Sequence, residues 1–441
     1  MGYRIRKLLN FTLDQDLGEL SHAEWVIYWS IVLTPLWWLL GIQTLLFMLI
    51  PVYLFIRGFD LDRVLSQRLP IAIWAWMLVC IVTLSLALIS LANLGLPSGK
   101  IVSSLVTFMK GYFLIFACMI TPFWHRVRIK VITRAVCWVA FSYLITLSIQ
   151  VFCLLAHIWK DPIAPPLAKL IPGDKMSLQV KPAVWQKFFG ILLPRTCLYT
   201  ADPPIPAICG LLFYFICRGE ENKRLRIMGV TGSVVALIVS QSRLAWVCFP
   251  FTILTSAFFQ HFFARQLSLW GMTGVSTLSA MLGITIKEML NKPMEIFNGA
   301  RAESSADRAR VVGATLKAWQ EYPWFGWGVP QGSVKWYIYD IELGSFSTYA
   351  AMLYLQGYFG FTFFMLALFS TLCTCAAAGI NGSVTGARAV GALLGLYFLM
   401  ESLPITWVAV YFWVFFVWIG AIFAENTDSR AIVPQWRHLS A

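Results

Sequence analysis

The 441-residue chain has few charged residues and lacks the signatures of the common nucleotide-dependent and metal-dependent enzymes. Charged residues make up 12% of it, against about 25% in an ordinary soluble domain, so the chain is not suited to folding in water alone. It contains no glycine-rich phosphate loop, no HExxH pair and no nucleophile elbow. These absences leave an ATP-driven enzyme and a metallohydrolase without support, and we expect neither a cofactor nor a metal.

The cysteines give no structural information, sequence repeats are absent, and the positive charge is not concentrated in one region. All of the ten cysteines except Cys197 fall within or at the ends of apolar segments, so no disulfide framework or metal-binding spacing follows. No repeat of fixed period and no low-complexity segment occurs. The net charge of +13 is distributed over connecting loops rather than over one soluble face. Nucleic acid is therefore not an expected partner.

Long apolar runs dominate the chain instead. Hydrophobic residues make up 59% of the sequence, and the mean hydropathy is +0.71. We therefore predict an all-α, polytopic integral membrane protein with about twelve transmembrane helices and a large, partly helical external loop. The predicted spans are residues 24–41, 42–57, 70–93, 101–122, 132–157, 204–217, 227–241, 244–260, 268–285, 347–372, 386–403 and 405–423.

Lysine and arginine predict the orientation. They concentrate in the loops on the same side as the N-terminus, whereas the short loops of the other side carry only Lys100 and Arg243. Both termini are therefore predicted to be cytoplasmic. The predicted parts are a transmembrane bundle at 1–285 (nine spans, with an external loop at 158–203), an external loop domain at 286–346, and three further spans with a cytoplasmic tail at 347–441.

Four arginines on the predicted outer side are candidates for binding a phosphate-bearing substrate, because a guanidinium donates two parallel hydrogen bonds and stays charged. Arg195 precedes the sixth span and Arg243 ends the turn after the seventh, while Arg308 and Arg310 begin the helical part of the large loop. An alternative for Arg243 is an interfacial side chain that reaches toward the headgroups. The alternative for Arg310 is a position on a solvated helix face, where Asp307 lies beside Arg310.

Other ionisable candidates are few. Lys110 lies near the middle of the fourth predicted span, a costly depth that suggests a function. It is expected to line a lipid-phosphate groove, or to pair with a buried carbonyl or with Glu401. His157 is the only histidine predicted on the outer side, and an ordinary interfacial position explains it as well. No pair among the outer carboxylates has a distinctive spacing.

Several short segments resemble the O-antigen ligase and polysaccharide polymerase (Wzy-type) superfamily of bacterial envelope enzymes. That family shows an arginine before a proline-containing turn, a Ser-Arg pair at a span end, an arginine ahead of Pro-x-x-Gly-x-Gly, then His-Asn-x-Tyr and Gly-x-x-Gly. The matching segments, between about residues 190 and 365, are Arg195 with Asp202-Pro203-Pro204, Ser242-Arg243, Arg308 with Pro323-Trp324-Phe325-Gly326-Trp327-Gly328, Phe346-Ser347-Thr348-Tyr349, and Gly357-Tyr358-Phe359-Gly360.

The chain departs from the family at its histidine, which falls at Phe346. In ligases this histidine is thought to activate the acceptor hydroxyl, and phenylalanine cannot accept a proton. Either another group serves as the base (Glu342, Asp340 or His157), or pyrophosphate leaves readily enough that no strong base is needed, or the chain is catalytically altered. The replacement favours a polymerase over an O-antigen ligase.

The resemblance implies a fold similar to GT-C-type glycosyltransferases and the polymerisation of O-antigen, capsule or exopolysaccharide at the outer face of the bacterial inner membrane. The donor would be an oligosaccharide on undecaprenyl pyrophosphate, in contact with membrane lipids and served by a flippase and a chain-length regulator. The implied site residues are Arg195, Arg243 and Arg308 on the pyrophosphate, Glu342 as the base, Arg310 and Lys110 in support, and Tyr349, Trp324 and Trp327 on sugar rings or in packing. Alternatives are a ligase-like transferase, a transporter of an anion or lipid-linked glycan, and a non-catalytic assembly partner.

Overall fold

The computed structural model describes residues 17–95, 98–168, 178–188, 190–282, 302–336 and 339–432, and most of them are helical. The predicted external residues 286–301 and both chain ends lie outside this part. The helices of the first half are α2 (His22–Val32), α3 (Thr34–Leu40), α4 (Gln43–Gly58), α5 (Leu61–Ser66), α6 (Ile71–Asn93), α7 (Ser98–Lys110), α8 (Tyr112–His125) and α9 (Ile129–Leu155). The later ones are α10 (Pro204–Cys217), α11 (Lys223–Val239), α12 (Arg243–Gln260), α13 (Phe262–Leu282), α15 (Ala302–Trp319), α16 (Thr348–Ile380), α17 (Val384–Leu399), α18 (Ile405–Val408), the 3-10 helix η3 (Ala409–Phe412) and α19 (Trp413–Ile432).

Apolar helices run through the whole described chain. Five of them are long and apolar enough to cross a membrane, or six if the bent pair α2 and α3 forms one span. The five are Ile71–Asn93, Ser98–His125, Ile129–Leu155, Thr348–Ile380 and Ile405–Thr427. The mostly helical fold agrees with the predicted multi-pass membrane protein, while the number of twelve spans stays a prediction.

Two β-hairpins were not anticipated by the all-α prediction. Strands β1 (Val184–Phe188) and β2 (Ile191–Arg195) pair antiparallel, with Val184 opposite Arg195. Strands β3 (Ser333–Trp336) and β4 (Tyr339–Glu342) pair likewise, with Ser333 opposite Glu342. Each hairpin belongs to a predicted external loop, so strand pairing satisfies backbone hydrogen bonds there outside the helical bundle.

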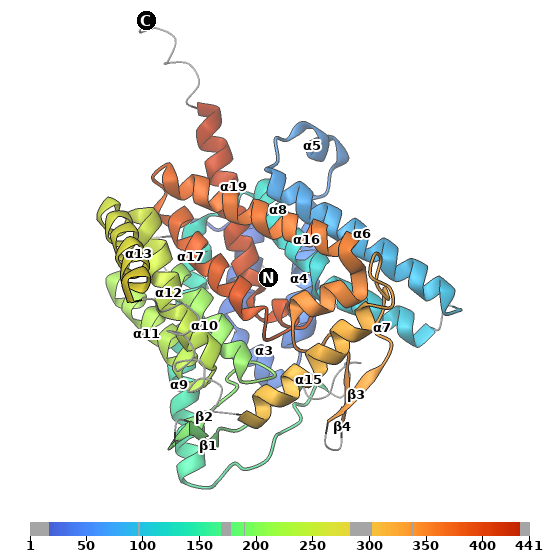
Figure 1. Ribbon diagram of the computed structural model, residues 1–441. Coiled ribbons are helices and arrows are strands. Elements are labelled where there is room, and N and C mark those ends of the chain that lie inside the picture. The colour runs from blue at the N-terminus through green and yellow to red at the C-terminus, as the bar shows by residue number, and fades with distance from the viewer. Residues whose placement is uncertain are drawn as a thin grey trace, which may run out of the picture.

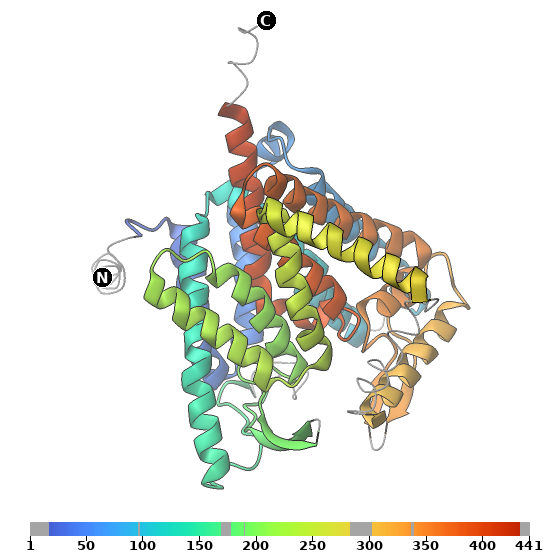
Figure 2. The same cartoon turned by 60° about the vertical axis from the view of Figure 1, so that its left-hand side comes forward.

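The elements separate toward two ends of the bundle. Figures 1 and 2 both show the hairpins and α15 at one end, and α5 with the C-terminal end of α19 at the other. The segments predicted to be external therefore share one end, as a consistent topology requires. Between the two ends, α19 forms the centre, because 89% of the apolar window that contains it is buried, compared with 22% for α9.

The turn after α15 is joined to α16 at a break in that helix. Gly357 has a non-helical backbone with φ +62°, which interrupts the hydrogen-bond ladder of α16. The turn supplies the missing partners: the amide groups of Trp327 and Gly328 donate to Tyr354 and Leu355 at 2.9 and 2.7 Å, respectively. In return, the amides of Tyr358 and Phe359 donate to Pro323 and Trp324, at 2.8 and 3.0 Å. The two glycine-containing motifs thus form one structural joint.

We expect Gly357→Ala to weaken this joint. A Cβ atom at residue 357 would lie 2.3 Å from the carbonyl oxygen of Trp324, and a positive φ disfavours any side chain. Backbone strain alone should lower the free energy of unfolding by about 1–3 kcal/mol, measured as a lower melting temperature in detergent. Gly313→Ala is the matched control, since a Cβ there meets nothing within 4 Å. Equal melting temperatures for both variants would contradict this role.

Candidate functional site

Arg195 and Arg243 are brought together where the β1–β2 hairpin meets the turn between α11 and α12. The guanidinium of Arg195 donates through Nε to the carbonyl oxygen of Ser240 at 3.2 Å and through Nη1 to Oε1 of Gln186 at 2.9 Å. Arg243 begins α12, three residues after Ser240. The side chain of Gln241 also donates to the backbone of the hairpin at Leu193. Two arginines from segments far apart in sequence therefore lie at the same end of the bundle.

Arg308 approaches from α15. Its guanidinium carbon lies 5.4 Å from the centre of the Phe346 ring, within the range of a cation–π interaction. Phe346 occupies the segment that joins β4 to α16, where the family pattern has histidine. The aromatic face cannot take up a proton, but it attracts the Arg308 cation and holds it at this point of the site.

Burial affects all three arginines, which we call the arginine cluster (Arg195, Arg243 and Arg308), and the charge of Arg308 affects the other two. Burial lowers the pKa of each guanidinium, because low dielectric disfavours the charged form. The charge of Arg308 lowers the pKa of both Arg195 and Arg243 further, so Arg308 lies within electrostatic range of each of them. Half-buried cations gathered in this way favour an anion that offers several oxygen acceptors.

Asp202 is the residue at this site that sequence reasoning did not single out. Its carboxylate raises the pKa of both Arg195 and Arg308, against the effect of burial. It follows Arg195 by seven residues, just before α10, in the Asp-Pro-Pro segment. The sequence placed it in a motif with Arg195 but gave it no role, and its effect on both Arg195 and Arg308 is seen only in the folded structure.

A second carboxylate stands beside Phe346. The hydroxyl of Ser347 donates to Oε2 of Glu401 at 3.0 Å and accepts from the amide of Ala350, so it also caps α16. Glu401 was considered above only as a partner for Lys110. The sequence separation of 54 residues between Ser347 and Glu401 hides this contact from local patterns.

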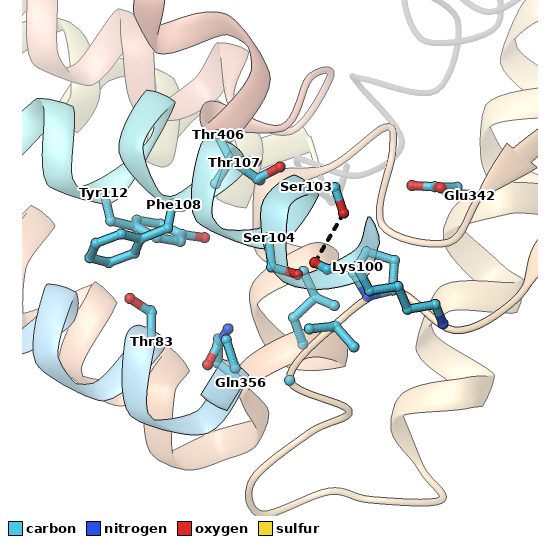
Figure 3. A pocket seen from close by; sticks show the side chains of 15 residues that line it. Thr83, Lys100, Ser103, Ser104, Thr107, Phe108, Tyr112, Glu342, Gln356 and Thr406 are labelled. Atoms are coloured by element: carbon cyan, nitrogen blue, oxygen red, sulfur yellow. Dashed lines mark hydrogen bonds between the residues drawn. The ribbon is translucent and has the colours of Figure 1, made fainter. Parts of the chain in front are cut away.

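Glu342 lines a pocket of about 220 Å³. Figure 3 shows its carboxylate at one end of the pocket and Phe108 with Tyr112 at the other. Asp340, on the same strand, and His157, just after α9, are both exposed and do not line this pocket. Lys110 lies near the middle of the candidate span Ser98–His125, as the sequence predicted, at the point where α7 ends and α8 follows after Gly111.

The remaining predicted residues lie around this site in different roles. Arg310 is exposed on α15, away from the half-buried position of Arg308. The indole of Trp327 donates to the carbonyl oxygen of Ala318 at 2.9 Å, which favours its alternative role in packing. The hydroxyl of Tyr349 donates to the carbonyl oxygen of Tyr397 at 2.8 Å and joins α16 to α17. Trp324 keeps 69% of its surface exposed, as a ring available to a ligand would.

Comparison with known proteins supports the family resemblance. Residues 228–365 match the sequence profile of the family described as O-Antigen ligase. This segment contains Arg243, Arg308, Glu342 and Phe346, and it ends just after the Gly357 break of α16. No curated protein matches the chain. The match indicates a role in surface glycan assembly with lipid-linked glycan substrates in a membrane, and it does not separate ligases from polymerases.

Proposed function

We propose that the chain is a polymerase of bacterial O-antigen, capsule or exopolysaccharide. It would transfer a glycan from undecaprenyl pyrophosphate to the terminal sugar of a second lipid-linked repeat at the outer face of the inner membrane. The observation that supports this proposal is the arginine cluster, in which half-buried Arg308 lies within electrostatic range of half-buried Arg195 and Arg243. Two of the three lie in the segment that matches the O-antigen ligase family. A pyrophosphate has the charge and the oxygens to pair with them.

The proposed reaction needs charge stabilisation more than it needs a strong base. The acceptor hydroxyl oxygen forms a bond to the anomeric carbon of the donor glycan, and the bond from that carbon to the pyrophosphate oxygen breaks. The electron pair leaves with undecaprenyl pyrophosphate, where the arginine cluster stabilises the developing charge. The hydroxyl proton passes to a carboxylate, for which we propose Glu342. Asp202 keeps Arg195 and Arg308 oriented, and Arg310 and Trp324 would contact the glycan outside the cluster.

Analysis of carrier-linked glycans in a deletion strain tests this function. Loss of a polymerase leaves single repeats on the lipid carrier, because transfer between carriers stops. Loss of a ligase leaves long polymer on the carrier, because only the final transfer stops. A transporter of the glycan would leave it on the cytoplasmic side. We expect single repeats at the outer face, and either of the other results would overturn the polymerase proposal.

We expect Glu342→Gln to slow transfer by about 10²-fold. General-base catalysis contributes about 10²–10⁴-fold, and we expect the lower end because a good leaving group reduces the need for a strong base. Glutamine keeps the size of the side chain but cannot accept the proton. The measurement is the rate of polymer formation by the purified protein from lipid-linked repeats. Asp340→Asn is the matched control, because Asp340 is exposed on the same strand and does not line the pocket. Equal rates for the two variants would exclude Glu342 as the base.

A further inference from the structure

A pocket with several hydroxyl groups in a partly apolar wall lies between α6, α7, α16 and the turn that follows α15. One face of α7 supplies much of its wall, because Lys100, Ser103, Ser104 and Thr107 follow the i, i+3, i+4, i+7 spacing of a single helix face. Figure 3 shows these side chains along the pocket, with Glu342 at its outer end. We call this the hydroxyl pocket. None of the residues of α7 is fully buried, so its polar face stays at least partly accessible.

Gln356 of α16 gives the clearest sign that the hydroxyl pocket receives a ligand. Its side chain lines the pocket and is only 4% exposed, yet its Oε1 atom has no hydrogen-bond partner among the residues that the structure describes. A buried amide oxygen without a donor is costly, and such groups are rarely left unsatisfied in folded proteins. A ligand hydroxyl that donates to Oε1 would remove this cost.

The charge of the pocket selects the class of ligand. Lys100 is its one basic lining residue and Glu342 its one acidic lining residue, so the wall carries no net charge, in contrast to the arginine cluster. The other polar lining groups are hydroxyls and an amide, which both donate and accept hydrogen bonds. Phe108 and Tyr112 form an aromatic end wall against which the apolar face of a sugar ring can pack. These features suit a neutral, polyhydroxylated ring.

The size and place of the pocket agree with a single ring. At about 220 Å³ it is smaller than sites for drug-sized ligands, which span about 300–1,000 Å³. Glu342, which lines the pocket, and Phe346, which contacts Arg308, are four residues apart, so their Cα atoms are at most about 14 Å from each other. We infer that the hydroxyl pocket binds one uncharged sugar ring, the terminal ring of the acceptor, with its reacting hydroxyl toward Glu342. The identification of this ring as the acceptor rests on the proposed function.

Saturation-transfer NMR on the full chain in lipid nanodiscs tests the inference. The probes are the methyl glycosides of glucose, galactose and N-acetylglucosamine, and we expect at least one of them to bind. Gln356→Leu should weaken its binding by about fivefold or more, the loss expected for one hydrogen bond. The double variant Ser104→Ala, Thr107→Val should weaken it as well, and it changes two residues of α7 that are not buried.

Two variants serve as controls. Gln43→Leu replaces a glutamine that is buried to a similar degree, at 6% exposure, outside the pocket, and it should keep sugar binding. Arg308→Ala should also keep sugar binding while losing affinity for inorganic pyrophosphate. Absence of binding by every glycoside, or unchanged binding in both the Gln356 and the α7 variants, would overturn the inference.

The polymerase function and sugar binding in the hydroxyl pocket are tested by independent experiments, so one can be wrong while the other is right. The function is decided by the carrier-linked glycans of the deletion strain, without any measurement of sugar binding. If single repeats accumulate there and no glycoside binds the purified protein, the acceptor site lies elsewhere. If glycosides bind through Gln356 but the deletion leaves glycans unchanged, the pocket is a sugar site of a protein with another function.

Discussion

Cells that carry Arg308→Ala in place of the wild-type protein are expected to lose long surface polysaccharide and to accumulate single lipid-linked repeats. Arg308 is half-buried and lies over the ring of Phe346, and its charge lowers the pKa of both Arg195 and Arg243. Removing one group that stabilises developing charge in a water-poor site slows a reaction by about 10²–10³-fold. The measurement is the length distribution of the glycan, together with the amount of protein in the membrane.

Lys317→Ala is the control for this experiment, because Lys317 is an exposed cation in the last turn of the same helix. The glycan length of Arg310→Ala should lie between those of Arg308→Ala and Lys317→Ala, because Arg310 is exposed and is proposed to contribute to binding from outside the cluster. Inorganic pyrophosphate gives an independent measure: at about 100 times its dissociation constant it should stabilise the wild type by about 2.7 kcal/mol, and Arg308→Ala much less. Unchanged long polymer in a well-folded Arg308→Ala variant would remove the proposed role of the arginine cluster.

Arg134→Leu is expected to produce the largest loss of stability. Arg134 of α9 binds Glu220 through two hydrogen bonds of 2.8 Å, and their side chains are 2% and 0% exposed. Removing one partner leaves a buried charge without its counterion, which costs about 3–5 kcal/mol. The measurement is the midpoint of thermal unfolding in detergent.

The double variant Arg134→Leu, Glu220→Leu separates this explanation from a simple loss of contacts. Without either charge no counterion is missing, and replacing both members of a buried pair by apolar residues is often close to neutral. We expect the double variant to be more stable than Arg134→Leu alone. If it is less stable, the ion pair is not the main contribution of these residues, and the hydrogen bond from the amide of Asn222 to Glu220 gains in importance.

The site was predictable from sequence where short motifs mark it. Ser242-Arg243, Arg308 and the Pro-x-x-Gly-x-Gly turn are local patterns, and the family match covers them. The contacts of Phe346 and of Glu401 were not predictable, because each depends on a residue from a distant segment. The same holds for Trp327, whose exposure to sugar or burial against α15 depends on how the turn docks at the break in α16.

Taken alone, the sequence determined the class of the protein, since long apolar runs and sparse charge allow only a membrane environment. It also identified the arginines of the candidate site. The tertiary structure decided which charges have partners and which groups remain unsatisfied. Arg134 appeared in the sequence as one more basic residue near a span end, yet it forms a buried ion pair with a residue 86 positions away. Gln356 appeared as an ordinary polar residue in an apolar span, and only the packing of α6, α7 and α16 turns it toward a pocket. Hydropathy and helical periodicity depend on neighbours in sequence, whereas ion pairs and pockets form between segments that are brought together only by folding.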